Sequence, residues 1–178
     1  MLKKLDEVMA LTPRDKIYST IVQNPGLHFR EIQRRVGIAT GALQYHLDYL
    51  KKKNFVREEK QGKFSHFYSI QGGEVDSGLM NLLRQESVRK IVLFLMNKRR
   101  ATLPTISENV QLSLSTTSFH MQKLLQAQVV IQKSIKGRVY FSLMDKERVL
   151  ILIVQYRKSF LDDLVDNFID TWERELKP

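Results

Sequence analysis

The chain of 178 residues repeats itself after 74 residues, and this repeat constrains its fold more than any other feature. Apolar positions recur at that offset without a gap up to a hairpin. Ile17 matches Ile91 and Ile32 matches Ile106. The aromatic-histidine pair Tyr45-His46 matches Phe119-His120. So long a gapless match indicates an internal duplication and predicts two small domains of one fold.

Each copy reads as three helices followed by a β-hairpin. In the first, Thr12 as cap and Pro13 at the first helical position predict a helix that ends before Asn24-Pro25-Gly26. Helices over 29–36 and 39–52 follow, separated by Gly37. Strands over 55–60 and 64–70 form the hairpin. The second hairpin turns at 136–138 and is expected to be about two residues shorter. We also expect a short helix over 2–10 and a connector helix over 76–83.

Residues 146–177 carry one apolar stripe at helical spacing, which includes Val149, Ile153, Phe160 and Phe168. The stripe predicts a single long helix of about 45 Å. So much apolar surface favours packing or homodimerisation over the alternative of an effector pocket lined by residues 156–172. The predicted class is mainly α with small hairpin wings (α+β). It has two tandem winged helix-turn-helix domains over 1–73 and 74–145, and a C-terminal helix over 146–178.

Charge separates the two repeats from the tail. The net charge of the whole chain is +10, with the excess in residues 1–145 and none in 146–178. A basic balance points to a polyanion such as nucleic acid, although charge of this size also serves solubility. The chain has no cysteine and no apolar run of membrane length, and its start lacks a signal-peptide core. We expect a cytoplasmic, nucleoid-associated protein without a metal or other cofactor.

The third helix of the first copy has an apolar stripe of Leu43, Leu47 and Leu50. Small and polar side chains lie opposite the stripe, which suits insertion into a DNA major groove. His46 and His120 fall at the edge of the stripe, where we expect hydrogen bonds to backbone rather than contacts to bases. Together with the other two histidines they match no metal-ligand spacing.

The segments Asn24–Ile32, Gly37-Ile38 and Gln44–Leu50 resemble archaeal winged-helix transcriptional regulators of the ArsR/MarR-like superfamily. The segment Leu112–Met121 is similar to the same signature. The resemblance covers about three quarters of the chain. It implies DNA binding by the third helix of each copy, with the wing on the flanking backbone or minor groove. It also implies homodimerisation through terminal helices. The chain departs from metal-sensing members because it has no cysteine.

The candidate DNA contacts lie on the third helices, the second helix of the first copy and the wing tips. Gln can pair with adenine, and a Tyr ring can contact a thymine methyl group. Basic side chains near a groove bind phosphate. The predicted base readers and close-approach positions are Thr40, Gly41, Gln44 and Tyr45, with Ser115, Thr116, Ser118 and Phe119 in the second copy. The predicted phosphate contacts are Arg30, Arg34, Lys51, Lys52, Lys60, Lys63, Lys136 and Arg138.

The copies are unequal. The lysine run at 51–53 has Leu125-Gln126-Ala127 as its counterpart, so the first copy is the favoured DNA reader.

The sequence predicts a sequence-specific regulator of double-stranded DNA. The alternatives are a protein-assembly adaptor and a non-specific chromatin or basal-transcription protein. An enzyme is not expected, because the chain lacks a cysteine nucleophile, a glycine-rich phosphate loop and the HExxH motif. The sequence does not specify the operator or a small-molecule effector.

Overall fold

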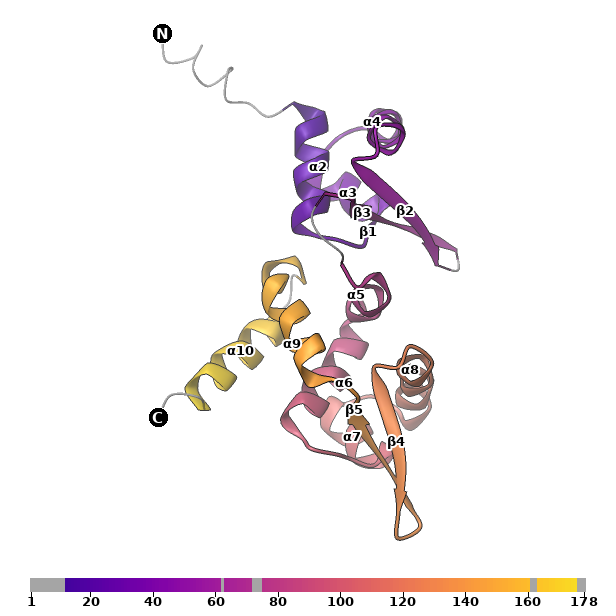
Figure 1. The fold of residues 1–178 in the computed structure, drawn as a ribbon, viewed down its shortest axis with the longest axis vertical. Helices are drawn as coiled ribbons and strands as arrows, with labels where there is room; N and C mark the ends of the chain where they lie inside the picture. Colours follow the sequence, from indigo (N-terminus) through magenta and orange to yellow (C-terminus); the bar gives the residue numbers. More distant parts are fainter. Residues whose placement is uncertain (1–11, 62, 72–74, 161–162, 176–178) are drawn as a thin grey trace. The chain divides into compact units, whose positions relative to one another are not determined.

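The computed structural model describes residues 12–61, 63–71, 75–160 and 163–175, and the helix expected over 2–10 lies outside these ranges. The chain divides into two compact units, residues 1–77 and 78–178. Both are mixed α+β with small antiparallel hairpins, so the predicted fold class is confirmed (Figure 1).

Within its described residues, the first unit has three helices and a small sheet. Its elements are α2 (Pro13–Gln23), β1 (Leu27–His28), α3 (Phe29–Val36), α4 (Thr40–Lys52), β2 (Val56–Gln61) and β3 (Phe64–Ser69). The strands lie in the order β1-β3-β2, all antiparallel. The two-residue strand β1 was not predicted, because two residues carry no readable alternation.

Local chemistry explains where these helices begin and end. The Thr12 hydroxyl accepts from the Asp15 amide at 3.2 Å, so the predicted cap forms, and the Asp15 carboxylate accepts from the Thr12 amide to complete a capping box. Gly37 ends α3 with φ of 72°. Asn54 takes the left-handed conformation after α4, with φ of 57°. The three predicted leucines of α4, Leu43, Leu47 and Leu50, are buried in one core with Ile17, Ile21 and Ile32.

The second unit repeats this architecture at the 74-residue offset. After α5 (Ser77–Leu83) come α6 (Glu86–Asn97), α7 (Leu103–Val110), α8 (Leu114–Gln126), β4 (Val130–Ile135) and β5 (Arg138–Leu143). A bridge between Ala101 and Phe141 corresponds to the pairing of Leu27 with Phe67 in the first unit. The left-handed positions Gln111 and Gln128 correspond to Gly37 and Asn54.

The prediction that the second wing is shorter is wrong. Both hairpins pair six residues on each strand, and Val56↔Ser69 corresponds to Val130↔Leu143. The error came from aligning the turns on glycine. The second turn is Lys136-Gly137 with φ of 49° and 75°, so its glycine stands where the first turn has Lys63.

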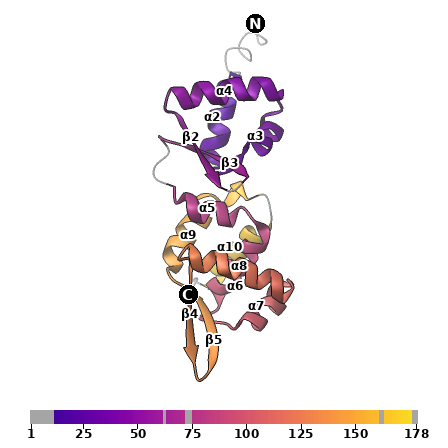
Figure 2. The same cartoon turned by 90° about the vertical axis from the view of Figure 1, so that its right-hand side faces the viewer.

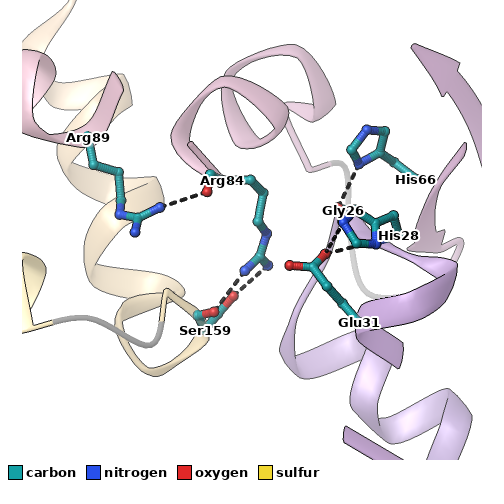
Figure 3. Close-up of polar contacts among 7 residues, drawn as sticks. All are labelled: Gly26, His28, Glu31, His66, Arg84, Arg89 and Ser159. Carbon is teal, nitrogen blue, oxygen red and sulfur yellow. Dashed lines mark hydrogen bonds and ion pairs between the residues drawn. The ribbon is translucent and has the colours of Figure 1, made fainter. Parts of the chain in front are cut away.

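The prediction of one long C-terminal helix is also wrong. The segment forms α9 (Lys146–Gln155), a 3₁₀ turn (Arg157–Ser159) and α10 (Asp163–Glu175). Tertiary contacts hold the break. Arg84 donates to the Ser159 carbonyl at 2.8 Å and to its hydroxyl at 2.5 Å (Figure 3), and Arg157 binds Asp166 and Asp170. The segment contains no glycine or proline, so the periodicity gave no sign of the break.

The apolar stripe of this segment packs inside the second unit. Val149, Ile153, Phe160 and Phe168 are buried. Leu164 and Phe168 also line an open groove of about 590 Å³ with residues of α6 and of the end of α7. Among the described residues, no helix is long and apolar enough to cross a bilayer.

Candidate nucleic-acid interface

The outward face of α4 presents the predicted base-reading residues of the first unit. Thr40, Gly41, Gln44 and Tyr45 are all exposed, and Tyr45 keeps 64% of its surface. Figure 2 shows α4 at the outside of its unit, with α2 behind it. The buried leucines fix the rotation of the helix, because they leave only this face free.

Two of these side chains are already oriented. The Gln44 amide donates to both carboxylate oxygens of Asp48, at 3.1 and 3.0 Å. Hydrogen bonds from Gln44 and then from Lys51 lower the pKa of Asp48. Thr40 accepts from the Gln33 side chain at 2.9 Å, which ties the start of α4 to α3. Gln44 is therefore held on the exposed face. A base edge that binds its amide NH₂ would have to displace the Asp48 carboxylate.

The start of α4 has no side-chain cap. Ala39 is the N-cap residue, and no side chain accepts from the first turn at this position. In the second unit, the Ser113 hydroxyl accepts from the Thr116 amide at 3.1 Å. The first unit thus lacks the cap that its counterpart has. The first-turn amides of α4 are consequently available to an anion such as phosphate.

The predicted phosphate contacts fall into two groups. Arg30, Arg34 and Lys52 are exposed on α3 and α4, and no ion pair is found for them among the described residues. Lys51 differs, because its ammonium group binds Glu58 at 2.8 Å and Asp48 at 3.1 Å. The pKa of Lys51 is raised, mainly by the hydrogen bond that Lys51 donates to Glu58. Its charge is thus partly offset by the wing.

Arg35, a further cation of α3, has a structural role. Its guanidinium donates to the Asn24 side chain at 2.6 Å, across the turn that follows α2. Burial lowers the pKa of Arg35, against an opposite effect of Glu31. A group held in this way fixes the position of α3 relative to α2.

The first wing is mixed in charge. Lys60 and Lys63 are exposed near the turn, whereas Glu58 and Glu59 lie on the same strand as Lys60. At the base of the sheet, His66 Nδ1 lies 2.8 Å from the Gly26 carbonyl. The Glu31 carboxylate accepts from the His28 amide at 3.1 Å, and its oxygen lies 3.5 Å from His28 Nε2 (Figure 3). These contacts join β1, α3 and β3.

In the second unit, the α8 face is uncharged and partly apolar. Ser115 is exposed and Thr116 and Ser118 are half-buried, while Phe119 keeps 55% of its surface. The Lys123 ammonium lies 4.3 Å from the centre of the Phe119 ring and covers part of its face. Lys136 and Arg138 are exposed at the tip of the wing, as predicted.

The two histidines of the repeat do not make the predicted backbone hydrogen bonds at Nδ1. That atom is buried without a partner in both His46 and His120, among the residues that the structure describes. Each imidazole ring instead packs against the preceding aromatic ring. The ring centres are 5.3 Å apart for Tyr45 and His46 and 5.5 Å apart for Phe119 and His120. The described residues hold no group of three metal-binding side chains.

Sequence reasoning missed a set of basic residues in the second unit. Arg100 precedes the bridge to β5, and its guanidinium lies 5.1 Å from the centre of the Tyr140 ring. Lys133 is paired directly opposite Tyr140. The run Lys98-Arg99-Arg100 was visible in the sequence, but its place beside the wing depends on the Ala101–Phe141 bridge.

Comparisons with known proteins agree with this geometry. Residues 12–90 match the model of the HVO_0163 N-terminal HTH domain family. The chain is also 27% identical over 136 residues to the uncharacterized HTH-type transcriptional regulator MJ1398 of Methanocaldococcus jannaschii. The match covers 76% of this chain and 34% of that protein, so the chain spans about a third of the length of its relative. The chain therefore carries a helix-turn-helix domain and is similar to an archaeal transcriptional regulator.

Proposed function

We propose that the chain is a sequence-specific regulator of transcription that binds double-stranded DNA. In this proposal α4 enters the major groove, with Gln44 and Tyr45 on base edges and Thr40 and Gly41 allowing close approach. Arg30, Arg34 and Lys52 bind the flanking phosphates, and Lys60 and Lys63 of the wing reach the backbone. The face of α8 is a second, weaker contact through Ser115, Thr116, Ser118 and Phe119, beside the wing cations Lys136 and Arg138.

One observation carries this proposal. The surface formed by α3 and α4 combines an exposed, uncapped helix start with polar and aromatic side chains. It also carries Arg30, Arg34 and Lys52, for which no ion pair is found among the described residues. An exposed tyrosine beside cations suits a groove that offers both methyl groups and phosphates. The helix-turn-helix match over residues 12–90 covers this same surface.

The test is selection of bound duplexes from a random DNA library, followed by affinity measurements over a range of salt. We expect a preferred sequence with affinity of about 10⁻⁸ to 10⁻¹¹ M and a steep salt dependence. Lys52→Glu with Lys53→Glu should weaken binding about 100-fold or more, because each change turns an attraction to phosphate into a repulsion. Binding without preference at every salt concentration would contradict a sequence-specific regulator and favour a general chromatin protein.

Dimerisation is the second part of the proposal. The buried stripe of α10 already has partners within its own unit, whereas Ile151 and Val154 of α9 are 58% and 50% exposed and lie one turn apart. We infer that this face of α9 joins two copies of the chain. Light scattering should give a dimer for the wild type and a monomer for Ile151→Glu with Val154→Glu. A dimer in both, or a monomeric wild type, would contradict this interface.

The alternative function of a protein-assembly adaptor has one observation in its favour. The α8 face is neutral and exposes Leu114 and Phe119. An adaptor needs no cations on α3 and α4, so the lysine variants above would leave its partner binding intact. Loss of DNA binding in those variants supports the regulator.

A further inference from the structure

The sheet of the second unit has a basic face, and only one of its residues, Arg138, is among the predicted DNA contacts. Residues directly opposite each other on paired strands share a face, as do alternate residues along a strand. Lys133 is opposite Tyr140, and Arg138 lies two residues before Tyr140. Arg100 joins them from the segment before the Ala101 bridge, with its guanidinium over the Tyr140 ring. We call these four residues the Tyr140 face.

The Tyr140 face is exposed and carries no opposing charge of its own. Arg100, Lys133 and Arg138 are all exposed, and no ion pair is found for them in the part of the chain that the structure describes. The segments 98–101 and 130–143 contain six basic residues and no acidic one. Figure 1 shows the β4–β5 hairpin extending away from the helices of its unit. The cations are therefore open to a large partner.

The contact between Arg100 and Tyr140 gives this face a defined geometry. A guanidinium over an aromatic ring is held by the quadrupole of the ring, worth about 0.5–1 kcal/mol at exposed sites, and it keeps its N–H donors at the edge. Such a planar group suits phosphate oxygens, which accept two parallel hydrogen bonds from it.

The equivalent face of the first unit is different. At the 74-residue offset, Arg100 corresponds to Gly26, Lys133 to Glu59, and Arg138 to Phe64. Phe64 is 63% exposed and stacks on His28 at 5.8 Å, and Glu59 pairs with Arg57 at 3.0 Å. The basic face is thus a feature of the second unit alone, and the common fold does not require it.

We propose that the Tyr140 face binds the phosphate backbone of duplex DNA without reading its sequence. The second unit then holds DNA mainly through its sheet, and α8 is the minor contact. This inference rests on the proposed function in that the partner is duplex DNA. It adds Arg100, Lys133 and Tyr140 to the contact surface, and it assigns Arg138 to this face.

The experiment measures how the affinity of the full-length chain for a mixed-sequence DNA duplex depends on salt. The test variant is Arg100→Gln with Lys133→Gln and Arg138→Gln. The matched control is Lys16→Gln with Lys146→Gln and Lys158→Gln, which removes the same charge from exposed positions on α2, the start of α9 and the 3₁₀ turn. Circular dichroism establishes that both variants are folded.

Each phosphate contact contributes about 0.9 to the slope of log affinity against log salt, so the test variant should lower the slope by about 2 to 3. The control should lower it by less than about 1. Preference for the selected sequence should survive in the test variant, because phosphate contacts do not read bases. Equal slopes for the two variants would overturn this inference and leave the proposed function standing. A wild type that binds duplexes without preference, yet shows the difference in slope, would overturn sequence-specific regulation and leave this inference standing.

Discussion

The two copies of the repeat have the same elements at the same offset but carry their charge in different places. Residues 29–53, which form α3 and α4, hold six basic and two acidic residues, whereas residues 103–127, which form α7 and α8, hold one of each. The sheet reverses this pattern, since the cations of the Tyr140 face stand where the first unit has glycine, glutamate and phenylalanine. Residues at buried positions keep the common fold, whereas residues at exposed positions differ in charge between the two copies.

The largest expected effect tests whether both copies depend on the same core. Leu47 and its counterpart Met121 are 1% and 2% exposed. Leu47→Ala and Met121→Ala should each lower the free energy of unfolding by about 2–5 kcal/mol, because each leaves a cavity between helices. Denaturant titration with a probe in each unit would show it. A loss below about 1 kcal/mol at either position would mean that this unit does not rely on its third helix.

The next effect tests the unequal charge of the third helices. Lys52→Gln with Lys53→Ala gives the first copy the residues of the second, and Gln126→Lys with Ala127→Lys makes the reverse change. At about 0.1 M salt the first exchange should weaken DNA binding by tens-fold, because each lysine that binds a phosphate raises the affinity about tenfold.

The reverse exchange should strengthen binding by less than about threefold, because the end of α8 does not engage DNA closely in this account. A gain from the second exchange as large as the loss from the first would show that both third helices bind DNA alike.

A smaller effect concerns the caps of these helices. Ala39 and Ser113 have nearly the same backbone, with φ of −64° and −61° and ψ of 149° and 152°. Ser113→Ala should cost about 1 kcal/mol of unfolding free energy, and Ala39→Ser should gain a similar amount. If the uncapped start of α4 receives a DNA phosphate, Ala39→Ser should also weaken DNA binding. Thermal unfolding and titration with the selected duplex would separate the two effects.

The smallest effect is a difference in pH response. Burial, and then Lys123, lower the pKa of His120, so its neutral form is favoured in the folded state. The second unit should lose stability as pH falls below about 6.5, the unfolded value, and His120→Gln should flatten that loss.

The stability of the first unit should change in a lower pH range. Lys51 lowers the pKa of Glu58, so this contribution is present above the unfolded value of about 4.3 and disappears as pH falls through the folded value. The pair is partly exposed, and its contribution should stay below about 1 kcal/mol. Measurements of unfolding from pH 7 down to pH 5 should therefore show the second unit losing stability first. A first unit that weakens earlier would contradict these assignments.

Much of the fold could be predicted because its signals are local or repeated. The cap at Thr12, the stop at Gly37 and the leucines of α4 each act within a few residues, and the second copy repeats the left-handed helix end, at Gln111, and the buried face of the third helix. The failures came from contacts between distant residues. The break near Ser159 depends on Arg84, 75 residues earlier, and the basic face depends on the bridge that brings Arg100 beside Tyr140. Lys51 looked free in the sequence because Glu58 belongs to the next strand.

The central claim is that α4 is the main reader of the DNA sequence and that α8 contributes much less. The most direct measurement is the ratio of affinities for the selected duplex and for a scrambled duplex of the same composition. Gln44→Ala with Tyr45→Ala should lower that ratio by about tenfold or more, since a base contact is worth about 1–3 kcal/mol. Ser118→Ala with Phe119→Ala, the same positions of the second copy, should change it by less than about threefold. An equal or larger loss from the second pair would contradict the claim.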